Sequence, residues 1–234
     1  MVIDPNIPSC GGCEHSCNAF CALAMEEKSF FSEGKKDTYV KKGQTIFKER
    51  HFPTGLYAVY KGKVKISKLG EEGKEQIVRF AKSGDLIGYR SLLSEDYYKA
   101  TATAIEDCKV CHIPKNIFFK VLTENKWLYL DLIKKLAEDL RNSEERIISI
   151  SQKTVKERIA ETLIILYHEF GMRDNKSIDV KLTRKEIGNI AGSTIETTIR
   201  TLSEFKKKGY IDFDGKKIII NSIPDLISIA NIHH

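Results

Sequence analysis

The sequence lacks the features of a membrane-bound or exported protein. No apolar run approaches the roughly 20 residues that a membrane-spanning helix requires. The first residues, Met1–Pro5, contain no basic segment followed by an apolar one, so no signal peptide is predicted. We therefore expect no membrane partner and a cytoplasmic location, in which thiols stay reduced.

Motifs of enzymatic catalysis are also missing. The sequence contains no Walker-type glycine-rich loop and no nucleophile with a base at a recognised spacing, so no enzyme is predicted. The net charge of +6 is shared between residues 1–150 and 151–234. Bulk charge alone therefore does not identify a nucleic-acid-binding protein, and the local arrangement of residues has to do so.

Cysteine is absent except in two short clusters. Four of the six cysteines lie within the first 21 residues, namely Cys10, Cys13, Cys17 and Cys21. The other two form a second close pair, Cys108 and Cys111. In a reducing compartment such clusters favour metal binding or redox chemistry over disulfides. The N-terminal four alone are enough for a zinc ion, and a thiol–disulfide switch is another alternative.

Residues from about Lys35 to Pro114 have the pattern of short β-strands. Runs rich in β-forming residues occur at 57–60, 64–66 and 77–80, and glycines at 62, 70, 73 and 84 provide turn signals between and after them. This spacing predicts an antiparallel barrel or sandwich.

A long helix is predicted after these strands, because no glycine or proline occurs from Trp127 until Gly171. Positions that alternate by three and four residues form a heptad seam with charged flanks: Ile133, Leu136, Leu140, Ser143, Ile147, Ile150 and Thr154. The seam favours a two-stranded dimer helix over residues 127–154. The alternative is a single amphipathic helix that packs on its own barrel.

The C-terminal part has the element order of a winged helix-turn-helix. We expect a helix to about Phe170, a strand over 178–182, a short helix over 184–190, a turn at 191–193 and a longer helix over 194–208. Gly209 is expected to end that helix, and an Asp214-Gly215 turn is expected to connect a hairpin over 210–220. Pro224 opens a last short helix.

The longer helix is predicted to have two different faces. Its inward face carries Thr198, Leu202 and Phe205, and its opposite face carries Glu196, Ile199, Arg200 and Ser203. In the major groove of DNA, Arg200 can donate two hydrogen bonds to guanine and Glu196 can accept one from cytosine. Ile199 suits a thymine methyl group.

Other residues near this helix are candidates for DNA contact. Ser193 and Thr197 lie at its start, and Lys206, Lys207 and Lys216 lie near its end and in the hairpin, where lysines can contact phosphates. Ser193 and Glu196 also have capping-box spacing, so a cap is the alternative role of Glu196. Any one of the lysines can instead be merely solvated.

With these motifs the chain resembles the Crp/Fnr family of bacterial transcription regulators. Segments 43–47, 56–66 and 84–88 resemble the β-roll of that family, and residues 183–200 resemble its helix-turn-helix. Glu196 and Arg200 match the family's Glu-x-x-x-Arg base readers. The resemblance implies an α+β fold with a cyclic-nucleotide-binding-like β-roll (jelly roll), a long dimerisation helix and a winged helix-turn-helix.

The resemblance also implies the domain organisation and the partners. The expected parts are a Cys-rich segment (1–27), a β-roll sensor domain (28–124), a dimerisation helix (125–152) and a DNA-binding domain (153–234). The partners would be a second copy of the chain, a roughly palindromic double-stranded DNA site and RNA polymerase. Oxygen-sensing Fnr proteins usually have serine where this chain has Ile199, so we expect a core around TGA rather than the full Fnr-type half-site.

Cyclic nucleotides are one of three effector classes in this family. Their binders have a Glu directly after Gly-x-x-x-Gly and an Arg-Ser pair further along the chain. Here Tyr89 follows Gly88, and the later stretch around Tyr98 contains no Arg-Ser pair. Arg90 and Lys99 remain alternative anion ligands. We expect no cyclic nucleotide.

A [4Fe-4S] cluster is the effector that the resemblance favours. Fnr-type sensors use three N-terminal cysteines and one on a β-roll strand just before Ile-Pro, a position that Cys111 matches. Cys10 and Cys13 match the family's close pair, whereas neither remaining N-terminal cysteine has the family's spacing. The favoured ligands are Cys10, Cys13, Cys21 and Cys111, with Cys17 as the alternative; zinc or thiol redox chemistry is the third effector class.

Cys108 is not expected to be a ligand. It lies three residues before Cys111 in a predicted strand, so the two side chains should point to opposite faces. A free cysteine packs as a small apolar residue. The sequence thus predicts a DNA-binding regulator that responds to oxygen or redox state. An electron-transfer protein would not explain the helix-turn-helix, and a cyclic-nucleotide module would not explain the C-terminal part.

Overall fold

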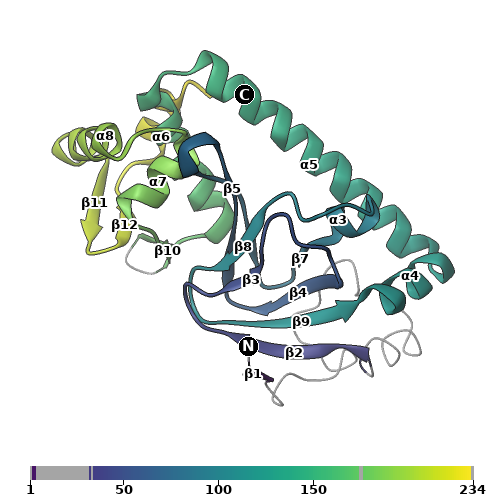
Figure 1. The fold of residues 1–234 in the computed structure, drawn as a ribbon. Helices are drawn as coiled ribbons and strands as arrows, with labels where there is room; N and C mark the ends of the chain where they lie inside the picture. Colours follow the sequence, from purple (N-terminus) through teal and green to yellow (C-terminus); the bar gives the residue numbers. More distant parts are fainter. Residues whose placement is uncertain (1, 4–31, 33, 174–175, 233–234) are drawn as a thin grey trace. The chain divides into compact units, whose positions relative to one another are not determined.

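The structure is a computed structural model that describes residues 2–3, 32, 34–173 and 176–232 (Figure 1). The chain divides into two compact units, Met1–Leu140 and Arg141–His234. The helix α5 (Lys126–Gln152) contributes to both units. No helix in the described part of the chain combines the length and the apolar character of a membrane span.

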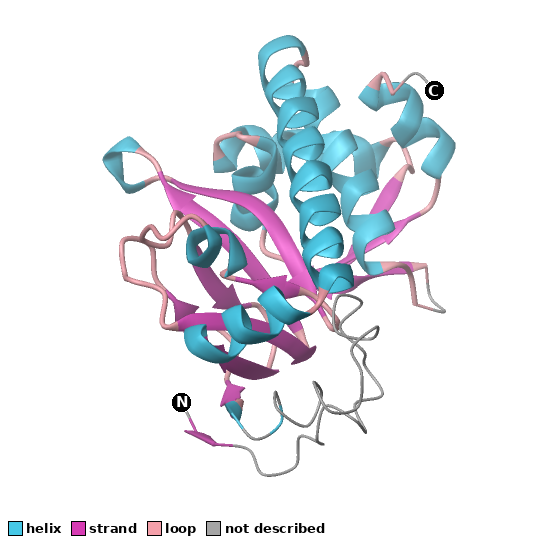
Figure 2. Cartoon of the chain, turned by 90° about the vertical axis from the view of Figure 1, so that its right-hand side faces the viewer, coloured by secondary structure: helices cyan, strands magenta, loops and turns pink. Residues whose placement is uncertain are grey.

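The first unit is built on two antiparallel sheets. One has the strand order β1-β2-β9-β4-β7, with bounds Val2–Ile3, Lys36–Val40, Cys108–Pro114, Gly55–Lys61 and Leu86–Ile87. The other has the order β3-β8-β5-β6, with bounds Thr45–Phe47, Thr101–Ala104, Lys63–Leu69 and Glu75–Lys82. These sheets confirm the predicted β-roll. Figure 2 shows these strands in magenta and the helices in cyan.

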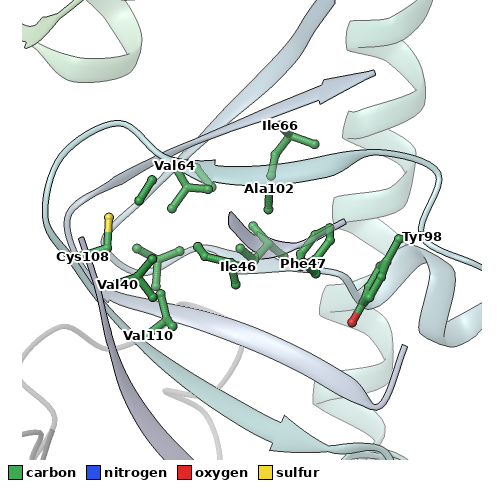
Figure 3. Packing of buried hydrophobic residues seen from close by; sticks show 13 residues of the cluster. Val40, Ile46, Phe47, Val64, Ile66, Tyr98, Ala102, Cys108 and Val110 are labelled. Carbon is green, nitrogen blue, oxygen red and sulfur yellow. The ribbon is translucent and has the colours of Figure 1, made fainter. Parts of the chain in front are cut away.

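An apolar cluster fills the space between the inner faces of the two sheets (Figure 3). Alternation along β5 explains it, because Val64 and Ile66 are buried while the lysines between them lean outward. Phe47 and Tyr98 stack in this cluster with ring centroids 4.1 Å apart. The Tyr98 hydroxyl, which is also buried, donates a hydrogen bond of 3.1 Å to the carbonyl of Gly55.

A second apolar cluster forms where helices pack on the first sheet. The helix α4 (Lys115–Glu124) contributes Phe118, and the first turns of α5 contribute Leu128 and Leu132. The short helix α3 (Tyr89–Leu93) adds Leu92. Sequence analysis predicted neither α3 nor α4, because each is too short to show a clear helical period. A 3-10 turn, η2 (Glu71–Gly73), lies between β5 and β6.

The predicted heptad seam is exposed along α5. Ile133, Leu140 and Ile147 are 46%, 62% and 67% exposed, whereas Leu128 and Leu132 are buried. The helix therefore packs on its own unit through a face other than the seam, which contradicts the alternative that the seam itself is covered by the barrel. Thr154 was wrongly included in the seam, because α5 ends at Gln152 and Thr154 caps the next helix.

The second unit has the predicted order of a winged helix-turn-helix. It contains α6 (Val155–Phe170), β10 (Ser177–Lys181), α7 (Arg184–Ala191), α8 (Ile195–Lys207), β11 (Ile211–Asp214), β12 (Lys217–Ile220) and α9 (Ile223–Ala230). Its three strands form a sheet in the order β10-β12-β11.

The turn of the β11–β12 hairpin differs from the prediction by one residue. Asp214 pairs with Lys217 in the ladder, so the connecting residues are Gly215 and Lys216 rather than Asp214-Gly215. A carboxylate–ammonium contact of 2.8 Å between Asp214 and Lys217 adds to that pairing. Gly215 has φ +59°, a conformation that glycine adopts without strain.

Candidate DNA-reading surface and cysteine site

The turn between α7 and α8 depends on two glycines. Gly192 ends α7 in the left-handed conformation, with φ 62° and ψ 47°. Gly188 lies where α8 crosses, and a Cβ atom there would be 2.7 Å from the Thr198 Oγ1. The two helices therefore approach closely, and this approach sets the orientation of α8.

The two predicted faces of α8 are confirmed. Thr198, Leu202 and Phe205 are buried, and the Thr198 hydroxyl donates a hydrogen bond of 2.8 Å to the carbonyl of Thr194. The opposite face carries the predicted base readers in exposed positions, namely Glu196, Ile199 and Arg200. Ile199 is 47% exposed, which is unusual for an apolar residue without a partner.

The predicted capping box of α8 is wrong. Thr194 rather than Ser193 is the N-cap residue, and its hydroxyl accepts a hydrogen bond from the N–H of Thr197. Glu196 is then the second residue of the helix, so it has no capping-box role. The side chain of Ser193 instead donates to the carbonyl of Thr194 at 3.2 Å.

The lysines near the end of α8 differ in their partners. Lys206 forms a 2.6 Å ion pair with Asp212 in the hairpin, and the hydrogen bond from Lys206 lowers the pKa of that carboxyl. Lys207 and Lys216 are exposed, and neither forms an ion pair within the described residues. Of the lysines predicted to contact phosphate, these two keep their whole charge available.

Two further residues of this surface were missed by sequence analysis. Ile195 is 41% exposed one turn before Ile199, and the spacing of four residues between two exposed isoleucines was the available signal. Arg184, at the start of α7, lies over the ring of Phe213 in the hairpin at 3.5 Å from the centroid. No local pattern predicts that contact, since the two residues are far apart in the sequence.

Cys111 is the one predicted metal ligand within the described residues; Cys10, Cys13, Cys17 and Cys21 lie outside them. Cys111 is buried on β9, between Asp37 of β2 and Ala58 of β4. The ammonium of Lys35 lies 4.0 Å from the Cys111 Sγ and 2.9 Å from a carboxylate oxygen of Asp37. A nearby cation favours the thiolate form of a cysteine.

Cys108 lies on the other face of β9, as predicted (Figure 3). Its thiol is buried in the inner cluster and donates to the carbonyls of Lys63 and Glu106 at 3.3 and 3.2 Å. Burial raises the pKa of the Cys108 thiol to about 11, which keeps it protonated. The described residues contain no cluster of three or more potential metal ligands.

The residues after Gly88 bind the chain itself. The Tyr89 hydroxyl donates a short hydrogen bond to the carboxylate of Asp139 on α5, and Arg90 Nε donates to the same carboxylate at 2.8 Å. Burial and this hydrogen bond raise the pKa of Tyr89 to about 12. Although burial raises the pKa of Asp139, the hydrogen bonds from Tyr89 and Arg90 and the charge of Arg79 bring it below its ordinary value.

Lys99 likewise has a partner of its own. It forms a 2.7 Å ion pair with Asp96 beside a surface hollow of about 350 Å³ that Arg50, Tyr97 and Tyr98 also line. The two alternative anion ligands, Arg90 and Lys99, therefore both pair with carboxylates of this chain.

Comparisons with known proteins agree with this arrangement. The family model of the cyclic nucleotide-binding domain matches residues 37–125, and the model of the Crp-like helix-turn-helix domain matches residues 157–229. The chain is 31% identical over 82% of its length to the anaerobic regulatory protein of Aggregatibacter actinomycetemcomitans, and it covers 75% of that protein. It is 33% identical over 77% of its length to electron transport regulator A of Shewanella oneidensis and covers 73% of it.

Solved structures show the same fold. FixK2 from Bradyrhizobium japonicum superposes with a TM-score of 0.76 at 25% identity, over 86% of this chain and 99% of that one. A Crp/Fnr family regulator from Eubacterium rectale gives a TM-score of 0.74 at 22% identity, over 92% of this chain and 100% of that one. With its β-roll, its winged helix-turn-helix and these relatives, the chain belongs to the Crp/Fnr family and is a DNA-binding transcription regulator, not an enzyme.

Proposed function

We propose that the protein is a homodimeric regulator that responds to oxygen or redox state through a [4Fe-4S] cluster. The ligands would be Cys10, Cys13, Cys21 and Cys111, with Cys17 in place of Cys21 as the alternative. The observation that carries the proposal is the position of Cys111. Its thiol lies on the face of β9 away from the inner cluster, with the Lys35 ammonium 4.0 Å away. Names of relatives such as "anaerobic regulatory protein" support it.

The chemistry of Cys111 fits a thiolate-bound group better than that of Cys108 does. Cys108 is enclosed by apolar side chains and its pKa is raised, whereas Cys111 has a cation beside it. Iron–sulfur clusters are held by thiolates, and a bound cluster supplies the sensitivity to oxygen and redox state. Within this chain, Cys111 would anchor that group to the first sheet, and Lys35 would stabilise the thiolate.

The homodimer is supported by the exposed seam of α5. A helix with a continuous row of exposed apolar side chains is stabilised when a second copy covers that row. We infer that the seams of two chains pair, with Ile133, Leu140 and Ile147 at the contact. Ser143, also exposed on the seam, adds no charge that would oppose this pairing.

The base contacts would come from the exposed face of α8. We expect Arg200 to bind guanine, Glu196 to bind cytosine and Ile199 to contact a thymine methyl group in a roughly palindromic site. Thr197 and Ser193 at the helix start, and Lys206, Lys207 and Lys216, would contact the backbone. RNA polymerase is included as a partner because the family regulates transcription.

Anaerobic purification tests the sensor. We expect a coloured protein whose iron and acid-labile sulfide are present in equal amounts, and whose absorption is lost in air. Cys111→Ser should abolish that absorption, whereas Cys108→Ala, which removes a thiol from the opposite face of the same strand, should retain it. A colourless protein with zinc and no sulfide would contradict the cluster and favour the zinc alternative. Equal iron in both variants would contradict the role of Cys111.

A further inference from the structure

Two arginines bind the backbone at the turn of the helix-turn-helix. The last carbonyl groups of a helix have no intrahelical partner and carry a partial negative charge. At the end of α7 three successive carbonyls, those of Ile190, Ala191 and Gly192, accept hydrogen bonds from guanidinium groups. The donors are Arg146 and Arg158, which lie on α5 and α6 rather than on either helix of the motif.

Arg158 joins the turn to the link between α5 and α6. Its Nε donates to the carbonyl of Ala191 at 2.8 Å and its Nη2 to that of Gly192 at 3.2 Å. Its Nη1 donates to the carbonyl of Lys153 at 2.7 Å, directly after the end of α5. The planar guanidinium can serve three acceptors at once, which a lysine ammonium on a flexible stem does not reproduce.

Arg146 makes the second connection, from α5 itself. Its Nη2 donates to the carbonyl of Ile190 at 2.8 Å, 44 residues along the chain. Near it, Ser149 of α5 donates a short hydrogen bond to Glu161 of α6, and the ammonium of Lys153 contacts the same carboxylate at 2.6 Å. The last turns of α5, the start of α6 and the turn before α8 are therefore held together by polar contacts that avoid the DNA-facing side of α8.

We propose that Arg146 and Arg158 are positioning residues that fix the recognition helix relative to the end of the dimer helix, and that they thereby determine the spacing of half-sites that the dimer accepts. The inference rests on the proposed homodimer. In a symmetric dimer the distance between the two recognition helices is set by how rigidly each is joined to the dimer contact. One inserted base pair moves a half-site by roughly 3.4 Å and turns it by about a tenth of a helical turn. A rigid joint rejects such a site, and a loosened joint tolerates it.

The test uses substitutions that conserve charge. Arg158→Lys and Arg146→Lys keep the electrostatic attraction to DNA but lose the hydrogen-bond geometry. Arg173→Lys is the matched control, because Arg173 belongs to the same unit, is 63% exposed and pairs with Asp179 away from the turn. A binding site is first selected by the wild-type protein from a random duplex library. Affinities are then measured for that site, for versions with one base pair added or removed between the half-sites, and for an isolated half-site.

We expect wild-type protein and Arg173→Lys to prefer the selected spacing strongly. In Arg158→Lys and Arg146→Lys this preference should fall by about tenfold, while affinity for the isolated half-site stays within about twofold of wild type. An equal loss on every duplex, half-site included, would show that the arginines only stabilise the reading unit and would overturn the inference. An unchanged spacing preference in both variants would overturn it as well.

Thermal melts decide which variant carries the result. If Arg158→Lys does not fold, Arg146→Lys, which loses the single hydrogen bond to Ile190, is scored by the same criteria. If the wild-type protein selects only single half-sites, the proposed dimer is wrong, and the inference that rests on it fails with it. A failure of the proposed function is thereby distinguished from a failure that concerns the two arginines alone.

Discussion

Charged side chains are used in opposite ways in the two units of the molecule. On α8 of the second unit, the side chains of Glu196 and Arg200 extend from an exposed face, and neither forms an ion pair in the part of the chain described. In the first unit, Tyr89 and Arg90 occupy the place where cyclic-nucleotide binders of this family present charged groups, yet both bind Asp139 of the same chain.

The difference shows which surface is built for an external ligand. A surface that reads another molecule leaves its hydrogen-bonding groups in water until the partner arrives, whereas a buried group without a partner is costly and has to be satisfied internally. By this criterion the second unit presents a binding face. The polar groups after Gly88 instead help to join α3 to α5.

The largest effect is expected from removing the main base-reading group. Arg200→Ala should lose about 1–3 kcal/mol of discrimination between bases, on the order of 10- to 100-fold in relative affinity, because a bidentate contact to guanine disappears. Competition with altered duplexes measures it, and thermal melts should be unchanged because the side chain is exposed. Arg173→Ala, which removes another exposed arginine of the unit, should leave discrimination intact. If both variants lost it equally, the contrast between the two units would fail.

The internal cluster of the first unit predicts a stability effect of similar size. Asp139→Asn should destabilise the protein by about 2 kcal/mol, because the buried guanidinium groups lose the carboxylate that balances them. Urea unfolding measures it. Asp131→Asn is the control, since its contact with Lys134 is long, at 3.9 Å, and exposed. Equal stability of the two variants would show that the cluster does not hold α3 to α5.

The same carboxylate predicts a pH dependence. The pKa of Asp139 is lowered in the folded protein, so its stabilising contribution is complete above the pKa of an unfolded aspartate, about 3.9, and is lost as the pH falls through the lower folded value. The stability difference between wild type and Asp139→Asn should thus be constant near neutral pH and shrink below about pH 4. A difference that grows on acidification would contradict the assignment.

The smallest effect concerns the two neighbouring lysines at the end of α8. Lys207→Ala should reduce the slope of log affinity against log salt by about one, because one phosphate contact is lost. Lys206→Ala should change the slope less, since the Lys206 ammonium already pairs with Asp212 at 2.6 Å. Titrations over a range of salt concentrations measure both. The reverse order would show that the ion pair with Asp212 opens on DNA.

Periodic and local signals were sufficient for the architecture. The spacing of turns and strands indicated the β-roll, and the helical period of α8 separated Leu202 and Phe205 from Arg200. The N-cap was misassigned because Ser193 and Thr194 are both good caps, and the packing of α7 on α8 decides between them. The clusters around Asp139 and Arg158 could not be predicted, since their partners lie 50 and 33 residues away and depend on tertiary packing.

Binding of the selected DNA site by anaerobically purified protein, before and after exposure to air, tests the central claim most directly. If Cys111 anchors a redox-sensitive group that controls the dimer, fluorescence anisotropy should show that affinity falls on aeration in the wild-type protein and in Cys108→Ala. In Cys111→Ser, aeration should have no effect. Wild-type protein that binds the site equally well with and without oxygen, and contains no iron, would contradict the account.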